Sequence, residues 1–309
     1  MADFRVGIDF GGTKIEIAAI ANDGRILLRR RVPNPSEYAA AIAAIRDLVE
    51  GVESELNGTG TVGVGIPGAV SPDTGLVKNA NSVWLNGRPF ARDLSEAMSR
   101  EVRVENDANC FALSEAVDGA GAGSRIVFGV ILGTGVGGGI VVDERVLVGR
   151  HSIAGEWGHT PLPWIRQDEF PLPRCFCGNE GCIERYLCGS ALAEDCDGPG
   201  SRDAHSIPER ADAGEEKAIR ALDRHAERLA RALAMVVNFL DPDAIVLGGG
   251  LSNMKHLYIQ VPKLLGRHVI SPQFSTPILP NKHGDSSGVR GAAWLWPRDQ
   301  PRIYRTSGS

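Results

Sequence analysis

Alternating hydrophobic and polar positions mark the first strands of the chain. Residues 4–20, FRVGIDFGGTKIEIAAI, predict two strands joined by a tight glycine turn, and residues 23–32 predict a third strand. Apolar positions then recur at near-helical spacing over residues 36–56, with Ser36 as the expected N-cap. The run TVGVGIPG at residues 61–68 predicts a buried strand. The chain is therefore expected to open as a β-meander that continues into an α/β fold.

The opening pattern starts again at residue 126. Residues 126–132 predict a strand, residues 133–139 a glycine-rich turn, and residues 140–149 a second strand. Before this repeat, residues 102–120 predict a short strand followed by a helix rich in small residues. Two such units indicate an internally duplicated α/β fold.

The C-terminal third predicts mostly helix. Residues 217–240 form a long amphipathic pattern, followed by a strand at residues 244–250 and a helix that begins near Ser252. Residues 194–216 are polar and rich in glycine and proline, so we expect a mobile loop or a poorly formed helix without a functional site. The tail after Pro297 is expected to be disordered.

Composition limits the class of protein. The chain has 309 residues, 43% of them hydrophobic and 23% charged, and its formal net charge is -5. Ordinary composition without a bilayer-spanning run or a signal peptide predicts a soluble, cytoplasmic protein with no membrane partner. The acidic balance argues against nucleic acid as a partner. Of the six cysteines, Cys110, Cys188 and Cys196 are scattered and are expected to be reduced.

The remaining three cysteines follow a histidine at metal-ligand spacing. His159, Cys175, Cys177 and Cys182 form the pattern H-x15-C-x-C-x4-C, which suits a closed tetrahedral Zn²⁺ site. Four protein ligands leave no open position for water, so the metal is expected to order a loop. The flanking carboxylates, Glu156 and Glu184, then become the functional candidates. The alternative is a set of unrelated buried thiols.

Three glycine-rich turns suit a nucleotide. GIDFGGTK (residues 7–14) lacks the lysine position of a P-loop, and GTGVGGG (residues 133–139) lacks the helix that a dinucleotide fingerprint requires. Both turns expose backbone N–H groups, so two loops could hold one polyphosphate. GGGLS (residues 248–252) lies between a strand and a helix, another position that suits a nucleotide. Each turn alone could be purely structural.

In this order, the motifs resemble the sugar kinases of the ROK family. They are GIDFGGTK, GIPG, ENDAN, GTGVGGG, AGEWGH, CFCGNEGCIE and LGGGLS. The resemblance implies a two-domain actin-like ATPase (ribonuclease H-like) α/β fold with a structural zinc knuckle. The expected domains are residues 1–115 with 287–309, and residues 116–286. Within the family the chain is most similar to the bacterial fructokinase that also acts on mannose, through residues 71–90 and 282–297, and next to bacterial N-acetylglucosamine kinase.

The resemblance implies phosphoryl transfer from ATP, with Mg²⁺, to the 6-hydroxyl of a hexose, which is D-fructose in this interpretation. Asp107 is the expected general base; read alone, it would also suit a helix N-cap. His159 would bind zinc through one ring nitrogen and the sugar through the other. A homodimer is expected. The residues expected to bind the sugar are Gly68, Asn79, Asn81, Asn106, Asp107, Glu156, His159 and Glu184. Those expected to bind ATP are Gly7, Ile8, Asp9, Phe10, Gly11, Gly12, Thr13, Lys14, Gly133, Thr134, Gly135, Val136, Gly137, Gly138, Gly139, Ile140, Gly249 and Gly250.

Two rivals come from other classes of function. A sugar-responsive repressor of the same family would need a helix-turn-helix ahead of the kinase-like core, and this chain begins with the first strand. A non-catalytic sugar-binding module would lack the base or a phosphate loop, and both are present.

Overall fold

The structure is a computed structural model that describes residues 4–298. The chain divides into two compact units. Within the described residues, unit 1 holds residues 4–125, 139–155 and 282–298, and unit 2 holds residues 126–138 and 156–281. The predicted tail lies largely outside the described residues.

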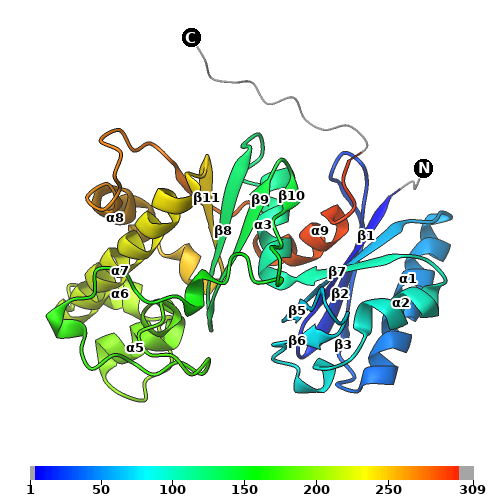
Figure 1. Cartoon of the computed structure of the whole chain (residues 1–309), viewed down its shortest axis with the longest axis horizontal. Helices are drawn as coiled ribbons and strands as arrows, with labels where there is room; N and C mark the ends of the chain where they lie inside the picture. The colour runs from blue at the N-terminus through cyan, green and yellow to red at the C-terminus, as the bar shows by residue number, and fades with distance from the viewer. Residues whose placement is uncertain (1–3, 299–309) are drawn as a thin grey trace, which may run out of the picture. The chain divides into compact units, whose positions relative to one another are not determined.

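Unit 1 is built on a mixed five-stranded sheet (Figure 1). Three strands pair antiparallel as the predicted meander, and two more run parallel to the central one. Side by side they are β3 (Ile26–Pro33), β2 (Lys14–Ile20), β1 (Arg5–Phe10), β4 (Thr61–Ile66) and β7 (Val102–Asn106). A small hairpin follows β4, made of β5 (Ala69–Val70) and β6 (Val77–Lys78).

Four helices cover the two faces of this sheet. Helices α1 (Tyr38–Leu56) and α2 (Phe90–Met98) contribute to the core on one face, and α3 (Asp107–Val117) and α9 (Ser287–Trp294) lie on the other (Figure 1). The cap of α1 differs from the prediction. Ser36 has a positive φ of 58°, and Glu37 is the N-cap, because its carboxylate accepts hydrogen bonds from the amides of Ala39 and Ala40.

The alternation along β1 and β4 explains their glycines. Val6 and Ile8 point into the core under α1 and α2, whereas Gly7 and Gly63 face α9. A Cβ at Gly7 would lie 2.7 Å from the backbone nitrogen of Ala293, and one at Gly63 would collide with a carbonyl of α9. The glycines of these strands therefore let a helix backbone approach the sheet closely.

Unit 2 carries the second sheet, which has the same strand order. Its strands are β10 (Arg145–Val146), β9 (Val136–Val142), β8 (Ile126–Leu132), β11 (Ala244–Gly248) and β12 (Ile278–Pro280). β9 begins earlier than the predicted strand at residues 140–149, so the turn is shorter. The end of β9 and all of β10 are grouped with unit 1 by their contacts, since a Cβ at Gly139 would lie 2.8 Å from the carbonyl oxygen of Ala108 in α3. These contact-based units differ from the predicted domain boundaries. The predicted boundaries stay a prediction.

The helices of unit 2 surround one long amphipathic helix, α7 (Figure 1). They are α4 (Glu184–Leu187), α5 (Gly189–Asp197), α6 (Ile207–Asp212), α7 (Glu216–Leu240) and α8 (His256–Leu265). The segment 194–216 is more ordered than predicted. Arg210 of α6 forms ion pairs of 2.7 Å with Asp197 and with Glu215, which fix α6 between α5 and α7. The helix expected near Ser252 begins at His256, after a short 3₁₀ turn.

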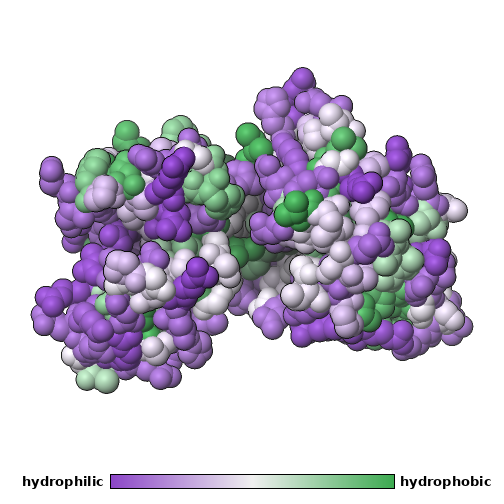
Figure 2. Space-filling model, turned by 90° about the horizontal axis from the view of Figure 1, so that it is seen from below, coloured by the Kyte–Doolittle hydropathy of each residue, from purple (hydrophilic) through white to green (hydrophobic). Residues whose placement is uncertain are grey.

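The face in Figure 2 is mostly hydrophilic, with hydrophobic side chains in scattered places. Within the described residues no helix is both long and apolar enough to cross a bilayer.

Candidate active site

In unit 1 the predicted base lies where β7 ends and α3 begins. Asn106 caps the helix, because its side-chain oxygen accepts hydrogen bonds from the amides of Ala108 (2.9 Å) and Asn109 (3.3 Å). Its side-chain nitrogen donates to the carbonyl of Gly68 (3.0 Å). The cap is therefore Asn106, and Asp107 is the first residue of the helix. This position stabilises a carboxylate, since the positive end of the helix dipole lies there.

A buried carboxylate supports this turn from behind. Glu105 Oε1 accepts hydrogen bonds from the Asn106 amide (2.8 Å) and from Asn109 Nδ2 (3.0 Å). Burial raises the pKa of Glu105, and these hydrogen bonds offset only part of that effect. Glu105 thus fixes the orientation of the capping residue, a role that the sequence did not indicate.

The loop that carries Asn79 and Asn81 is held at its centre. Asn86 brackets Ala80, accepting from its amide at 2.8 Å and donating to its carbonyl at 3.0 Å. Gly68 has a φ of 143°, and a Cβ there would lie 2.8 Å from Ala80 Cα. Asn79 and Asn81 are exposed beside this fixed point and can offer amides to a sugar.

The first glycine turn splits into buried and exposed parts. The side chains of Ile8 and Phe10 belong to the core of unit 1. Asp9 points to the opposite face, and its carboxylate lies 3.1 Å from where a Cβ at Gly288 would be. Burial raises the pKa of Asp9, and the charge of Glu16 raises it further. At the turn itself Gly12, Thr13 and Lys14 are exposed, after a hydrogen bond of 3.0 Å from the amide of Gly11 to the carbonyl of Lys14.

In unit 2 the four predicted metal ligands come together. Their ligand atoms all lie within 4.8 Å of one another. His159 Nδ1 faces Cys175 Sγ at 3.6 Å, and Cys177 Sγ lies 3.6 Å from Cys182 Sγ. Burial and the neighbouring thiols raise the pKa of Cys182 to about 12. The pKa of Cys177 is shifted the other way, because the hydrogen bond from the Asn179 amide and those of the neighbouring thiols lower it. Three thiolates this close would repel one another, and a Zn²⁺ ion would offset that repulsion, so the donor set fits zinc. The three other cysteines are free and buried.

The knuckle connects to the second glycine turn through Glu184. Its Oε2 accepts a hydrogen bond of 3.0 Å from the Val136 amide. A Cβ at Gly135 would lie 2.6 Å from the same oxygen, so a side chain there would displace the Glu184 carboxylate from this hydrogen bond. Trp157 Nε1 donates to the carbonyl of Gly137 (2.9 Å), and Glu156 beside it is exposed. Of the two predicted sugar-binding carboxylates of unit 2, that of Glu184 therefore lies against the predicted phosphate turn.

A cavity of about 1210 Å³ lies within unit 2. Gly133, Thr134 and Gly250 line it, as expected for nucleotide-binding residues. Gly249 has a φ of 79° and packs against the backbone of Leu132, so its absent side chain lets the two strand ends meet. The sequence missed one wall of the cavity, because the segment 194–216 was expected to hold no site. That wall includes Glu194, Arg202, Ala204, His205, Pro208, Glu209 and Asp212.

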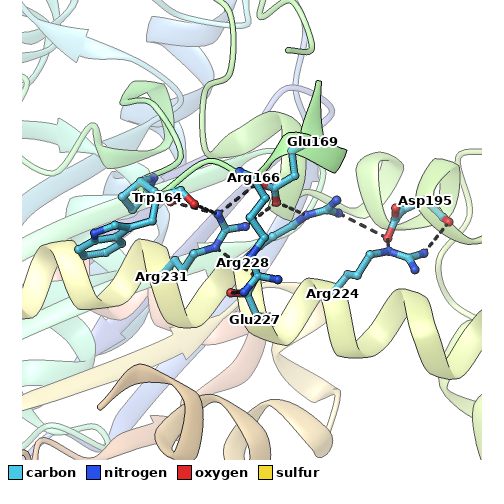
Figure 3. Close-up of polar contacts among 9 residues, drawn as sticks. Trp164, Arg166, Glu169, Asp195, Arg224, Glu227, Arg228 and Arg231 are labelled. Atoms are coloured by element: carbon cyan, nitrogen blue, oxygen red, sulfur yellow. Dashed lines mark hydrogen bonds and ion pairs between the residues drawn. The ribbon is translucent and has the colours of Figure 1, made fainter. Parts of the chain in front are cut away.

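A buried ion network ties the knuckle loop to α7 (Figure 3). Arg231 is 1% exposed and donates to the carbonyl of Trp164 (2.7 Å) and to Glu169 Oε2 (3.0 Å). Arg228 also donates to Glu169 (3.1 Å) and forms an ion pair of 3.4 Å with Asp195 of α5. Burial alone would raise the pKa of Glu169, but the hydrogen bonds, led by that from Arg231, lower it overall. The network holds the loop that leads into the knuckle and the helix that lines the cavity.

The chain is similar to known proteins over nearly its whole length. The sequence profile of the ROK family matches residues 5–299. The N-acetyl-D-glucosamine kinase of Vibrio cholerae is 42% identical over 297 residues, which cover 94% of this chain and 98% of that protein.

Two solved structures share the fold. A ROK hexokinase from Thermus thermophilus has a TM-score of 0.84 at 31% identity, covering 94% of this chain and 97% of that one. A ROK family glucokinase from Streptomyces griseus, in complex with glucose and AMPPNP, has a TM-score of 0.75 at 29% identity, covering 94% of this chain and 98% of that one. These likenesses confirm the predicted two-domain actin-like fold. They do not support the predicted likeness to fructokinase, because the relatives at about 40% identity are N-acetyl-D-glucosamine kinases.

Proposed function

The chain belongs to the ROK family and is an ATP-dependent sugar kinase, and we propose that its acceptor is N-acetyl-D-glucosamine, phosphorylated at the 6-hydroxyl. One observation carries the choice of sugar: relatives of 40–42% identity, matched over 94% of this chain, bear the name of that enzyme. D-fructose, the acceptor favoured by the sequence, has no comparable support. The candidate residues alone do not separate the two sugars, since their amides and carboxylates suit any vicinal hydroxyls.

Asp107 is the general base of this proposal. The 6-hydroxyl oxygen forms a bond to the γ-phosphorus as the bond from that phosphorus to the leaving oxygen of ADP breaks. The hydroxyl proton passes to the Asp107 carboxylate. The transition state is loose, so the enzyme mainly positions the acceptor and neutralises charge. The cap at Asn106 and the support of Glu105 keep the carboxylate at a fixed point of the helix start.

Each unit, taken by itself, carries residues that we assign to the sugar. In unit 1 these are Asn106 and, more weakly, Gly68, Asn79 and Asn81. In unit 2 they are Glu156, His159 and Glu184. His159 turns Nδ1 toward the cysteine cluster, which leaves Nε2 for a sugar hydroxyl. Bound zinc would fix the tautomer and orientation of this ring.

ATP is assigned to the glycine turns and the cavity. The exposed residues of the first turn, Gly12, Thr13 and Lys14, would meet its phosphates, and Gly133 and Thr134 lie at the cavity that would hold the nucleotide. Mg²⁺ would neutralise phosphate charge when bound. Asp9 suits a place near that ion, because its carboxylate is half-buried with a raised pKa, and a nearby cation would stabilise the ionised form.

A coupled ADP-release assay tests the proposal. We expect the highest kcat/KM with N-acetylglucosamine among N-acetylglucosamine, fructose, mannose and glucose. A clear preference for fructose would support the acceptor that the sequence favoured and would refute the proposed acceptor, N-acetylglucosamine. Identification of the product phosphate position by NMR would test the 6-hydroxyl assignment.

A further inference from the structure

Arg185 stands out among the residues that line the cavity of unit 2. It is half-buried, and its Nε is fully buried without a hydrogen-bond partner. Among residues 4–298, no carboxylate forms an ion pair with its guanidinium. A buried guanidinium nitrogen without a partner is costly, and the charge of Arg185 is not neutralised by a carboxylate, so this arginine at a cavity wall suits an anionic ligand.

Comparison with other buried arginines sharpens the point. Several also have an Nε without a hydrogen bond, but their terminal nitrogens are engaged with carboxylates. These pairs are Arg100 with Glu53, Arg231 with Glu169 and Arg290 with Asp118. Arg185 lacks any equivalent within the described part of the chain. The other strong cations that line the cavity, Arg202 and Lys255, are exposed to solvent, which weakens their pull on an anion.

The backbone of Arg185 is fixed between the knuckle and the glycine turn. Its amide donates to the carbonyl of the zinc-ligand candidate Cys182 at 2.9 Å. The preceding residue, Glu184, accepts from the Val136 amide, and Gly189 just beyond α4 donates to the carbonyl of Gly133 at 2.8 Å. The arginine thus projects from a segment that is anchored on both sides.

We propose that Arg185 binds the phosphate chain of the nucleotide in this cavity. A guanidinium presents a planar set of N–H donors that matches phosphate oxygens, and it stays charged at any working pH. Gly133 and Thr134 of the predicted phosphate turn line the same cavity as Arg185. The nucleotide phosphates would therefore lie near the Arg185 guanidinium. The zinc knuckle then serves the nucleotide as well as the sugar, because Cys182 orients Arg185. This inference rests on the proposed place of ATP.

Direct nucleotide binding tests the proposal without relying on the sugar. Isothermal titration with ADP is compared for the wild type, Arg185→Gln and Arg174→Gln. Arg174 is a matched control, since it lies on the same knuckle, is exposed and does not line the cavity. We expect about 10-fold to 100-fold weaker ADP binding for Arg185→Gln and no change for the control.

Two further measurements make the outcome specific. The zinc content and melting temperature of Arg185→Gln should match those of the wild type. Arg185→Lys, which keeps the charge but not the planar donors, should bind ADP with an affinity between those of the wild type and Arg185→Gln. Equal ADP affinity of wild type and Arg185→Gln would overturn the proposal. A wild type that binds ADP but prefers another sugar would refute the proposed acceptor and leave this inference standing.

Discussion

The two sheets of the molecule have the same strand order but support their loops by different means. In unit 1 the order β3-β2-β1-β4-β7 corresponds to β10-β9-β8-β11-β12 in unit 2. The meander strand β3 has eight residues, whereas its counterpart β10 has two. Unit 1 positions its candidate base with one helix cap and short loops. Unit 2 inserts a long segment after β10 and holds it with a metal cluster and buried ion pairs.

The difference shows what a repeated scaffold leaves free to vary. In both units the reactive candidates follow strand ends: Asp107 after β7, Gly133 after β8, and Gly249 after β11. Such strand ends are rigid supports for loops of any chemistry. The comparison therefore predicts that unit 1 carries the proton transfer, and that the metal-anchored loop of unit 2 contributes to ligand binding.

The largest expected effect comes from changing the candidate general base of unit 1. Asp107→Asn should lower kcat by about 10²-fold to 10⁴-fold, because the general base is lost. Asn can still accept the hydrogen bond from the Ala108 amide, so the helix start should survive. Steady-state kinetics with separate ADP and sugar titrations would show affinity kept and turnover lost. Asp47→Asn, on the exposed face of α1, is the control with normal turnover. Near-normal kcat in Asp107→Asn would place the base elsewhere.

The next effect tests the ion network of unit 2 (Figure 3). Arg231→Ala should reduce the free energy of unfolding by about 3–5 kcal/mol, because it leaves Glu169 buried without its main partner. Arg224→Ala removes a more exposed pair with Asp195 and should cost less than about 1 kcal/mol. Urea denaturation of both variants measures the difference. Equal losses would mean that burial does not decide the strength of these pairs.

Spacing and alternation predicted much of the site. Three cysteines and a histidine at ligand spacing gave the cluster that the structure brings together, since four ligands in about 24 residues restrict a loop strongly. The strand and helix around Asp107 were visible because Val102 and Val104 alternate with polar residues and a run rich in small residues follows. The sequence places Gly7 in a predicted phosphate turn and Gly63 in a predicted buried strand, but it does not show that both glycines allow α9 to approach the sheet.

Contacts far apart in sequence were not predictable. The wall of the cavity at residues 194–216 has no clear apolar period, and its order comes from the ion pairs of Arg210 and from packing on α7. The sequence could not decide the choice of sugar, because one added substituent changes few contacts in a pocket. The homodimer and the roles of individual ligand-binding residues stay predictions.

The third effect tests whether bound metal anchors the loop of unit 2 that carries Glu184 and Arg185. Cys177→Ser should remove most bound zinc and raise the KM for both sugar and ATP by about 10-fold to 100-fold, because the loop that carries Glu184 and Arg185 loses its anchor. Elemental analysis and two-substrate kinetics check this. Cys196→Ser changes a cysteine outside the cluster and should keep one zinc per chain. Full zinc content or unchanged KM values in Cys177→Ser would show that the cluster is not the anchor.

The smallest effect concerns a buried histidine of unit 2. His225 is 1% exposed, and its Nε2 lies 3.1 Å from the carbonyl of Leu187. Burial, with smaller contributions from the charges of His256 and Arg228, lowers its pKa to about 4 against the opposing effect of the hydrogen bond to Leu187. The unfolded chain, with a pKa near 6.5, binds a proton that the folded chain does not.

The stabilising contribution of neutral His225 is therefore complete above about pH 6.5 and is lost as the pH falls toward 4. Between pH 6.5 and 5 the loss should be about 1–2 kcal/mol. His225→Gln keeps a donor for the Leu187 carbonyl but cannot titrate, so its free energy of unfolding should fall less over this range. Urea denaturation at pH 7, 6 and 5 compares the two proteins. Parallel curves would mean that His225 is not the source of acid sensitivity, and unit 2 would then differ from unit 1 in its metal and its ion pairs only.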